Sequence, residues 1–215
     1  MTAPLAMYGA ALRSAGVGRA PRLQLVGVDG TPLVEVQPAQ WTGGLRPGDE
    51  GLLARCHGPT IDVGCGPGRL AAALTDLGHP TVGIDVSAEA IRQARRRGVL
   101  ALCRSVFDRV PAEGRWRHVL LADGNLGIGG DPARLLRRCA RLLDHGGTVL
   151  AELLPPGERT WATHVVLRHG RHQSRAFPWA AVAASDVVGL AGAATLRIHD
   201  RWTEAGRWFI SLTRP

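Results

Sequence analysis

The chain of 215 residues contains no lysine, so all 26 basic residues are arginine. It has few aromatic residues and only four cysteines, which lie far apart and form no Cys-x-x-Cys pair. That spacing argues against a zinc site or a disulfide framework and favours reduced thiols, as in a cytoplasmic protein. We therefore expect no structural metal and a cytoplasmic location.

Long apolar runs are also missing from the sequence. No stretch approaches the ~18 residues that a membrane-spanning helix needs, and the N-terminus lacks the basic region of a secretory signal. With 45% hydrophobic and 20% charged residues, the chain is nevertheless too apolar to be disordered. We expect one globular domain over residues 1–215 that does not enter a membrane.

The formal net charge is +8, and it has two interpretations. Clustered arginines would indicate a nucleic-acid partner, whereas a coding bias toward arginine would scatter them. Most arginines are dispersed, and the dense runs at 92–97 and 134–141 fall on expected helices. Nucleic acid is therefore our second choice of partner, after a small molecule.

Strand and helix patterns alternate through the middle of the chain, which is typical of an α/β fold with a parallel sheet. Ser87 and Asp131 are suited to cap helices, and Pro132 suits a first helical position. The expected helices cover 69–77, 87–98 and the segment after 131. The expected strands cover 60–63, 81–84, 99–103, 118–122 and 148–153.

The flanking segments have different patterns. They predict a helix over 3–15, hairpins over 23–36 and 163–177, a helix over 179–190, and closing strands over 195–199 and 207–213. We divide the expected single domain into four parts: an N-terminal lid (1–50), a core (55–153), an insertion (155–180) and a closing part (181–215).

A glycine-rich loop lies between the first expected strand and helix of the core. Alternating glycines in residues 61–68, Ile-Asp-Val-Gly-Cys-Gly-Pro-Gly, let the backbone turn sharply and approach a ligand. The helix start behind the loop offers free N–H groups. Asp85 ends the second strand, close to the ~20-residue offset at which an acid meets ribose hydroxyls in dinucleotide-binding folds. An adenosine-containing ligand is predicted.

The glycine spacing distinguishes between ligands. The pattern Asp62-x-Gly64-x-Gly66-x-Gly68 differs from the G-x-G-x-x-G of dinucleotide binders, which disfavours an NAD(P)-linked enzyme. It resembles the first motif of class I S-adenosylmethionine-dependent methyltransferases, and Val-Gly-Ile-Asp-Val-Ser at 82–87 resembles their second. Residues 119–132 and 142–149 resemble the fourth- and fifth-strand regions, with His145 where proline is usual.

The resemblance implies a fold and a cofactor. The fold would be an α/β, Rossmann-like seven-stranded, mostly parallel sheet with flanking helices, plus hairpins at the N-terminus and after the fifth strand. The cofactor would be S-adenosyl-L-methionine, with S-adenosyl-L-homocysteine as product. Asp85 would hold the ribose, and Asp123 and Asn125 would line the methionine end. Ser105 or Asp108 would meet the adenine. The implied cofactor-binding residues are Asp62, Gly64, Cys65, Gly66, Gly68, Asp85, Val86, Ser105, Val106, Asp108, Asp123 and Asn125.

Methyl transfer to an oxygen or nitrogen of high pKa also needs a general base. Ligands of open parallel sheets bind outside the carboxyl ends of the strands, and four of the histidines precede or begin strands. The candidates that remain are His164, His169, His172 and His199, of which we select His169, His172 and His199.

Aromatic residues of the flanking segments are candidates for a substrate pocket. Trp161, Phe177 and Trp179 would either wall a pocket for an aromatic or apolar molecule or simply cover the sheet, with Trp41 as an opposite lid. We predict an S-adenosylmethionine-dependent methyltransferase that methylates an O, N or C atom of a small molecule. One alternative is an RNA or DNA methyltransferase, although the sequence lacks the D/N-P-P-Y/F motif of amino-methylating nucleic-acid enzymes. The other is a non-catalytic binder of the cofactor or its product.

Overall fold

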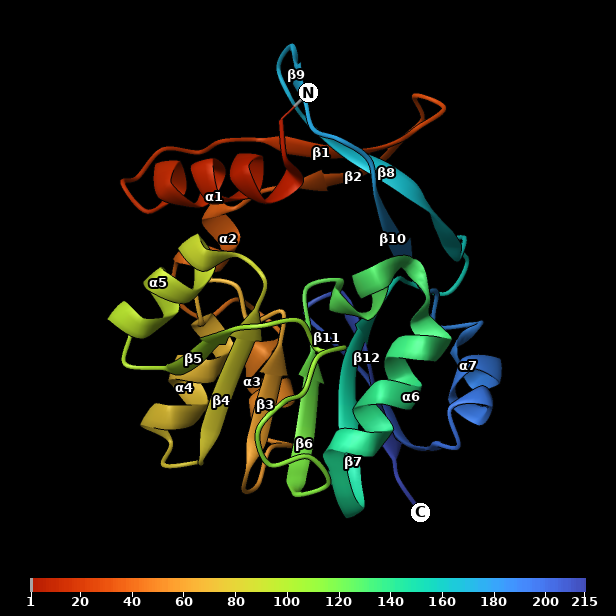
Figure 1. Ribbon diagram of the computed structural model, residues 1–215. Coiled ribbons are helices and arrows are strands. Elements are labelled where there is room, and N and C mark those ends of the chain that lie inside the picture. The colour runs from red at the N-terminus through yellow and green to blue at the C-terminus, as the bar shows by residue number, and fades with distance from the viewer. Residues whose placement is uncertain (1) are drawn as a thin grey trace.

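The computed structural model describes residues 2–215 and contains two β-sheets (Figure 1). The larger, the main sheet, has seven strands in the order β11-β12-β7-β6-β3-β4-β5. The strands from β5 to β7 are parallel, whereas β12 is antiparallel to both neighbours. The bounds are β3 (Thr60–Val63), β4 (Thr81–Asp85), β5 (Leu100–Cys103), β6 (Trp116–Leu121), β7 (Leu143–Leu153), β11 (Arg197–Glu204) and β12 (Arg207–Thr213). The predicted seven-stranded, mostly parallel sheet is confirmed.

Helices cover both faces of the main sheet, which explains why its central strands are apolar on both sides. Ile61 and Val63 pack toward α6 (Pro132–Leu142) and α7 (Val187–Ala193). Leu120 and Phe209 pack on the opposite face, against α3 (Asp49–Leu53) and α4 (Arg69–Asp76). The helix α5 (Ala88–Arg96) packs beside α4.

The second sheet, the cap sheet, joins two distant parts of the chain. It has the strand order β10-β8-β1-β2, and β9 pairs with β8. The pairing of β1 with β8 brings the N-terminal hairpin onto the insertion after β7. Figure 1 shows this sheet above the upper end of the main sheet. The bounds are β1 (Leu23–Gly27), β2 (Pro32–Val36), β8 (Trp161–His169), β9 (His172–Gln173) and β10 (Phe177–Ala181).

The helix α1 (Pro4–Ala15) lies between the cap sheet and α5. Its residues Met7 and Ala11 pack on Leu23 and Leu25 of the cap sheet, and Arg13 pairs with Glu89 of α5 at 3.6 Å. The short helix α2 (Ala39–Thr42) follows the N-terminal hairpin. The predicted helix over 3–15 and the predicted hairpin over 23–36 are confirmed. The first strand of the hairpin expected over 163–177 is present in β8. Its second strand, expected over 173–177, is divided into β9 and β10, which both pair with β8.

Two glycines let the cap sheet rest on the segment after β6. This segment, η1 (Asn125–Gly130), meets β10 so closely that a Cβ on Gly127 would lie 1.9 Å from the Ala180 carbonyl oxygen. A Cβ on Gly130 would lie 2.8 Å from the Cβ of Pro178. The glycine-rich sequence after β6 is thus explained by the close approach of another backbone.

Two expectations about the C-terminal part are wrong. The helix expected over 179–190 begins only at Val187, because Trp179 and Ala180 pair with β8 opposite Thr163 and Ala162. The strand expected to end at His199 continues to Glu204 as β11. The alanine- and valine-rich run before α7 suits either element, and pairing with β8 decides it.

The predicted helix caps are confirmed. Ser87 Oγ accepts a hydrogen bond from the Ala90 amide at 3.3 Å, and Asp131 Oδ1 accepts one from the Arg134 amide at 2.9 Å. No helix within residues 2–215 is both long and apolar enough to cross a membrane.

His118 is a buried histidine at the amino end of the main sheet. Its Nε2 atom lies 2.9 Å from the His57 backbone nitrogen, and its Nδ1 atom lies 2.8 Å from Thr148 Oγ1. Only 5% of the residue is exposed. Burial lowers the pKa of His118 from 6.5 to about 4.

We predict that His118 makes stability depend on pH. Unfolded His118 takes up a proton near pH 6.5 and folded His118 only near pH 4, so its contribution is complete above 6.5 and lost as pH falls toward 4. Chemical denaturation of wild type and His118→Gln between pH 7 and 4 measures this. Asp62 has a raised pKa, so its contribution to stability changes with pH in the opposite direction. Because Asp62 is present in both proteins, this contribution cancels when the two unfolding free energies are subtracted. Wild type should lose more unfolding free energy than the variant, and parallel curves would contradict the prediction.

Candidate functional site

The glycine loop connects β3 to α4 at the carboxyl end of the main sheet. Gly64 has φ +73° and Gly68 has φ +83°, in the left-handed region that favours glycine. A Cβ on Gly64 would lie 2.8 Å from the side-chain Cγ and Nδ2 atoms of Asn125, and one on Gly68 would lie 2.8 Å from the Cβ of Ala94. Both positions therefore require glycine for conformation and for space.

Asp85 ties the loop to the end of β4. Its Oδ2 atom accepts a hydrogen bond from the Gly66 amide at 3.0 Å, and its Oδ1 atom accepts one from the Ser87 amide at 2.7 Å. Burial raises the pKa of this carboxyl, whereas the amide bonds lower it. Each carboxylate oxygen has a further lone pair, so Asp85 can still accept hydroxyl groups.

Asp62 is a second buried acid beneath the loop, and only 3% of it is exposed. Burial and the negative charges of Asp123 and Asp85 raise its pKa to about 7, against a hydrogen bond from the Ala71 amide that lowers it. The raised pKa brings the titration of this acid close to neutral pH. A cation bound nearby would favour its ionised form.

The turn after β6 reaches back to the glycine loop. Asp123 and Gly124 both have positive φ, +53° and +82°. Asn125 Nδ2 then donates hydrogen bonds to the carbonyl oxygens of Val63, at 3.0 Å, and Gly64, at 2.9 Å. The structure thus brings Asn125, which the resemblance implies at the methionine end of the cofactor, into contact with the glycine loop.

Three arginines and three carboxylates surround this turn. Arg46 Nη1 lies 2.8 Å from Asp123 Oδ1, and Arg69 Nη2 lies 2.6 Å from Asp123 Oδ2. Both carboxylate oxygens of Asp123 are therefore ion-paired. Sequence reasoning found only Asp123 among these groups. The residues of this ionic cluster are Arg46, Arg69, Arg207, Asp49, Asp123 and Glu152.

The loop after β5 holds the residues predicted to meet the adenine. Ser105 Oγ accepts a hydrogen bond from the Phe107 amide at 3.2 Å, and Asp108 is exposed. Val86 is 49% exposed at the end of β4, but Val106 is buried in the core between the main sheet and α6. The structure thus places Val106 in the core and not in an exposed wall of the site.

Arg138 of α6 fixes the backbone of that loop. It donates to the carbonyl oxygens of Val106 and Asp108, both at 2.7 Å. It also pairs with Glu113, and its hydrogen bonds lower the pKa of that carboxyl to about 2. The loop conformation therefore depends on one buried arginine from the next helix.

The three predicted histidine bases lie away from the glycine loop. His169 and His172 face each other at the β8–β9 turn, and Figure 1 shows β9 at the outer end of the cap sheet. His199 lies in a bulge near the start of β11. Because β11 runs parallel to β7, its start is at the opposite edge of the main sheet. The expectation that His199 lies at the carboxyl end of its strand is wrong, because β11 continues to Glu204.

Tyr8 is a site residue that sequence reasoning missed. A Cβ on Gly66 would lie 3.5 Å from Tyr8 Oη, so the phenol of α1 reaches the glycine loop. Burial, with the charges of Asp85 and other acids, raises its pKa well above 10. The Trp41 ring packs edge-on to Tyr8, with centroids 5.9 Å apart. No local signal distinguishes Tyr8 from other apolar-face residues of α1.

Trp161, Phe177 and Trp179 are half-buried on the cap sheet. They pack against the cluster that contains Met7 of α1, and Phe177 and Trp179 are edge-on with centroids 6.2 Å apart. These aromatic rings form part of the apolar layer above the main sheet, together with α1.

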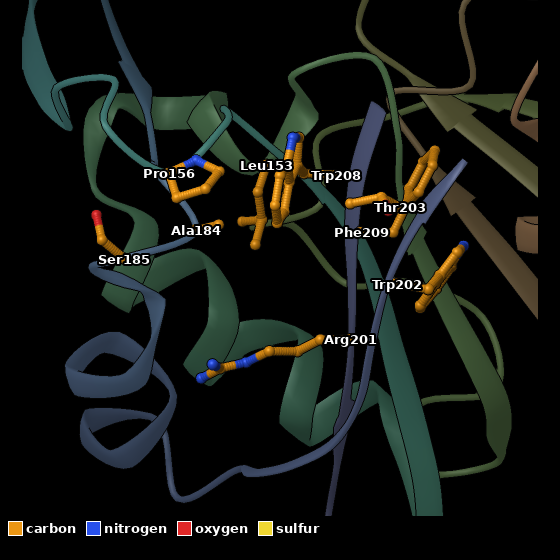
Figure 2. Close-up of a pocket in the computed structure, with 9 residues that line it drawn as sticks. All are labelled: Leu153, Pro156, Ala184, Ser185, Arg201, Trp202, Thr203, Trp208 and Phe209. Carbon is orange, nitrogen blue, oxygen red and sulfur yellow. The ribbon is translucent and has the colours of Figure 1, made fainter. Parts of the chain in front are cut away.

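A separate groove of about 440 Å³ lies at the end of the main sheet formed by β7, β12 and β11. Figure 2 shows Trp208 beside Leu153, with Pro156 and Ala184 near them and Arg201 below. The groove is lined from β7, β11 and β12, away from the glycine loop between β3 and α4. Its lining residues are Leu153, Pro156, Ala184, Ser185, Arg201, Trp202, Thr203, Trp208 and Phe209.

Sequence comparisons identify similar proteins. A family model described as a methyltransferase domain matches residues 61–147. An uncharacterized protein of Mycobacterium tuberculosis is 37% identical over 144 residues, which cover 67% of this chain and 46% of that protein. A ubiquinone biosynthesis O-methyltransferase of Sodalis glossinidius is 31% identical over 112 residues, 49% of this chain and 45% of that protein. The chain spans about half the length of these curated relatives.

Solved structures share the fold. An S-adenosylmethionine-dependent methyltransferase from Bacteroides fragilis, in complex with S-adenosyl-L-homocysteine, has a TM-score of 0.78 at 21% identity. The match covers 98% of this chain and 94% of that one, so it includes the cap sheet. A methyltransferase from Streptomyces caelestis has a TM-score of 0.58 at 20% identity and covers 77% of this chain and 93% of that one.

We predict that Gly64→Ala destabilises the chain by more than backbone strain alone. Left-handed backbone costs a residue with a Cβ about 1–3 kcal/mol, and here the Cβ would also displace Asn125 from its two carbonyl partners. Gly18→Ala is the matched control, since Gly18 has φ +79° and no atom within 4 Å of an added Cβ. Chemical denaturation should give the larger loss for Gly64→Ala. Equal losses would show that Asn125 is not held by the loop.

Proposed function

The chain belongs to the class I, Rossmann-like methyltransferases, and from that premise we propose that it transfers a methyl group from S-adenosyl-L-methionine to a small molecule. One observation above all supports the proposal. Asp85, at the end of β4, accepts a hydrogen bond from the Gly66 amide of the glycine loop at 3.0 Å. A carboxylate that can accept hydroxyl groups therefore lies next to a loop whose backbone a ligand can approach closely. This is the chemistry that a ribose carrying a sulfur-linked chain requires.

Several groups of this chain fit the cofactor. Asp85 keeps free lone pairs for the two ribose hydroxyls. Asp62, with its raised pKa, would be held ionised by a positively charged ligand. The exposed surface of Val86 would cover the adenine, and Ser105 or Asp108 would meet its amino group.

The protein's main task in the reaction is positioning. The cofactor supplies a methyl group already activated by its sulfonium. The chain's residues hold the two reactants in line, and good alignment of two reactants contributes up to ~7–11 kcal/mol to a reaction. Tyr8 and Trp41 cover the loop from the side of α1 and would exclude water there. His169, His172 and His199 are not assigned as bases, because their elements place them away from the loop.

A small acceptor is supported by the cap sheet. Trp161, Phe177 and Trp179 add half-buried aromatic surface above the carboxyl end of the main sheet, which suits an aromatic or apolar molecule. Curated relatives include ubiquinone biosynthesis O-methyltransferases, which is consistent with a small acceptor.

Nucleic-acid methylation is the second candidate, and one observation favours it. Residues 161–185 include Arg168, Arg171 and Arg175 but no acidic residue, and Arg171 and Arg175 are exposed on the β8–β10 side of the cap sheet. Phosphate contacts of such arginines would make binding strongly dependent on salt.

We predict that calorimetric titration detects binding of S-adenosyl-L-methionine and S-adenosyl-L-homocysteine but not NAD. Asp85→Asn should weaken both by at least about tenfold, because it removes a charge and an acceptor at a buried position. Asp200→Asn is the control, since Asp200 lies on β11, away from the loop, and pairs with Arg55, which follows α3. Binding of NAD alone, or unchanged affinity in Asp85→Asn, would reject the proposal.

The same titration separates the alternatives. Short RNA that binds with a steep salt dependence would move the assignment to nucleic acid. Conversion of S-adenosyl-L-methionine to its demethylated product in the presence of a small acceptor distinguishes an enzyme from a non-catalytic binder.

A further prediction concerns pH. Because the pKa of Asp62 is about 7 in the free protein, a bound sulfonium must displace its proton below that pH. Affinity for S-adenosyl-L-methionine should therefore rise from pH 6 to pH 8 in wild type. Asp62→Asn should show a flatter dependence, measured by the same titration. An equal slope in both proteins would remove Asp62 from the site.

A further inference from the structure

Glu152 of β7 is a largely buried acid that the proposed cofactor contacts do not use; its side chain is 16% exposed. Its Oε2 atom accepts a hydrogen bond from the Asp123 amide at 2.7 Å. Arg207, from β12, donates to both of its oxygens, each at 2.9 Å. This two-point contact fixes the carboxylate more firmly than a single ion pair would.

The Asp123 amide is where such a contact matters most. Asp123 has φ +53°, a conformation that residues with a Cβ rarely adopt, and Gly124 follows with φ +82°. The two left-handed residues turn the chain so that Asn125 faces the glycine loop. If the Asp123 amide had no hydrogen-bond acceptor, right-handed or extended backbone would be favoured over the left-handed conformation of Asp123.

The next contact lies within the loop itself. Asn125 Nδ2 holds the carbonyl oxygens of Val63 and Gly64 at 3.0 and 2.9 Å. The space that Asn125 occupies is the space that a Cβ on Gly64 would need. A continuous series of contacts therefore leads from β12, through Glu152 and the turn after β6, to the loop at the end of β3.

We propose that Arg207 and Glu152 are positioning residues for the cofactor loop, acting through the Asp123–Gly124–Asn125 turn. The proposal rests on the proposed function, because the loop matters only if it binds the cofactor. Neither residue needs to touch the cofactor. Arg207 also donates to Asp49 at 2.7 Å, so the pair is anchored to α3 as well as to β12.

Titration of purified Glu152 variants with S-adenosyl-L-homocysteine tests this proposal. Glu152→Ala leaves the Asp123 amide without its acceptor and should weaken binding about tenfold. Glu152→Gln keeps an oxygen acceptor and should lose about threefold or less. Asp200→Ala removes the ion pair between Asp200 of β11 and Arg55, and this variant should bind as wild type does.

A double-mutant cycle separates positioning from a general loss of stability. If Glu152 acts through Asn125, Glu152→Ala should weaken binding much less in an Asn125→Ala background than in wild type. Fully additive effects, or wild-type affinity in Glu152→Ala, would overturn the proposal. Failure of wild type itself to bind would instead reject the proposed function.

Hydrogen exchange covers the case in which Glu152→Ala does not fold. Exchange at the amides of residues 123–125 should be faster in Glu152→Gln than in wild type, and S-adenosyl-L-homocysteine should slow it in wild type. Unchanged exchange at these amides in Glu152→Gln would equally overturn the proposal.

Discussion

The ionic cluster is the interaction on which the arrangement of the site depends. Arg46 comes from the segment between α2 and α3, Arg69 from the start of α4 and Arg207 from β12. All three meet acids at the carboxyl ends of β6 and β7 or in α3. Buried charges cost several kcal/mol each unless they are paired. Each segment must therefore stay in place for the charges on the other segments to remain paired. The turn at Asp123 is held at the point where these segments meet.

The cap sheet imposes the second constraint. Its pairing of β1 with β8 makes the N-terminal segment part of the same layer as the insertion after β7, and the close contact of β10 with Gly127 fixes that layer to η1. The helix α1 then carries Tyr8 to the glycine loop. The main sheet supplies the edge that carries the glycine loop, and the cap sheet lies above this edge (Figure 1).

Local features of the sequence predicted local structure well. The glycine loop, the caps at Ser87 and Asp131 and the order of core elements follow from turn chemistry and periodicity. The pairing of β1 with β8 and the ionic cluster had no local signal, because 26 scattered arginines do not reveal which three meet in the cluster. The alanine-rich sequence around Trp179 predicts a helix, but pairing with β8 overrides that preference. The sequence pattern ends the strand of His199 too early, and this places His199 at the wrong end of the strand.

The measurement that tests this account most directly is a crystal structure with S-adenosyl-L-homocysteine bound. The account predicts the ribose hydroxyls on the Asp85 carboxylate, the sulfur-linked chain along residues 64–68, and the Asp123–Asn125 turn in its present conformation. A ligand bound in the groove of Figure 2, or a ribose that does not contact Asp85, would contradict it.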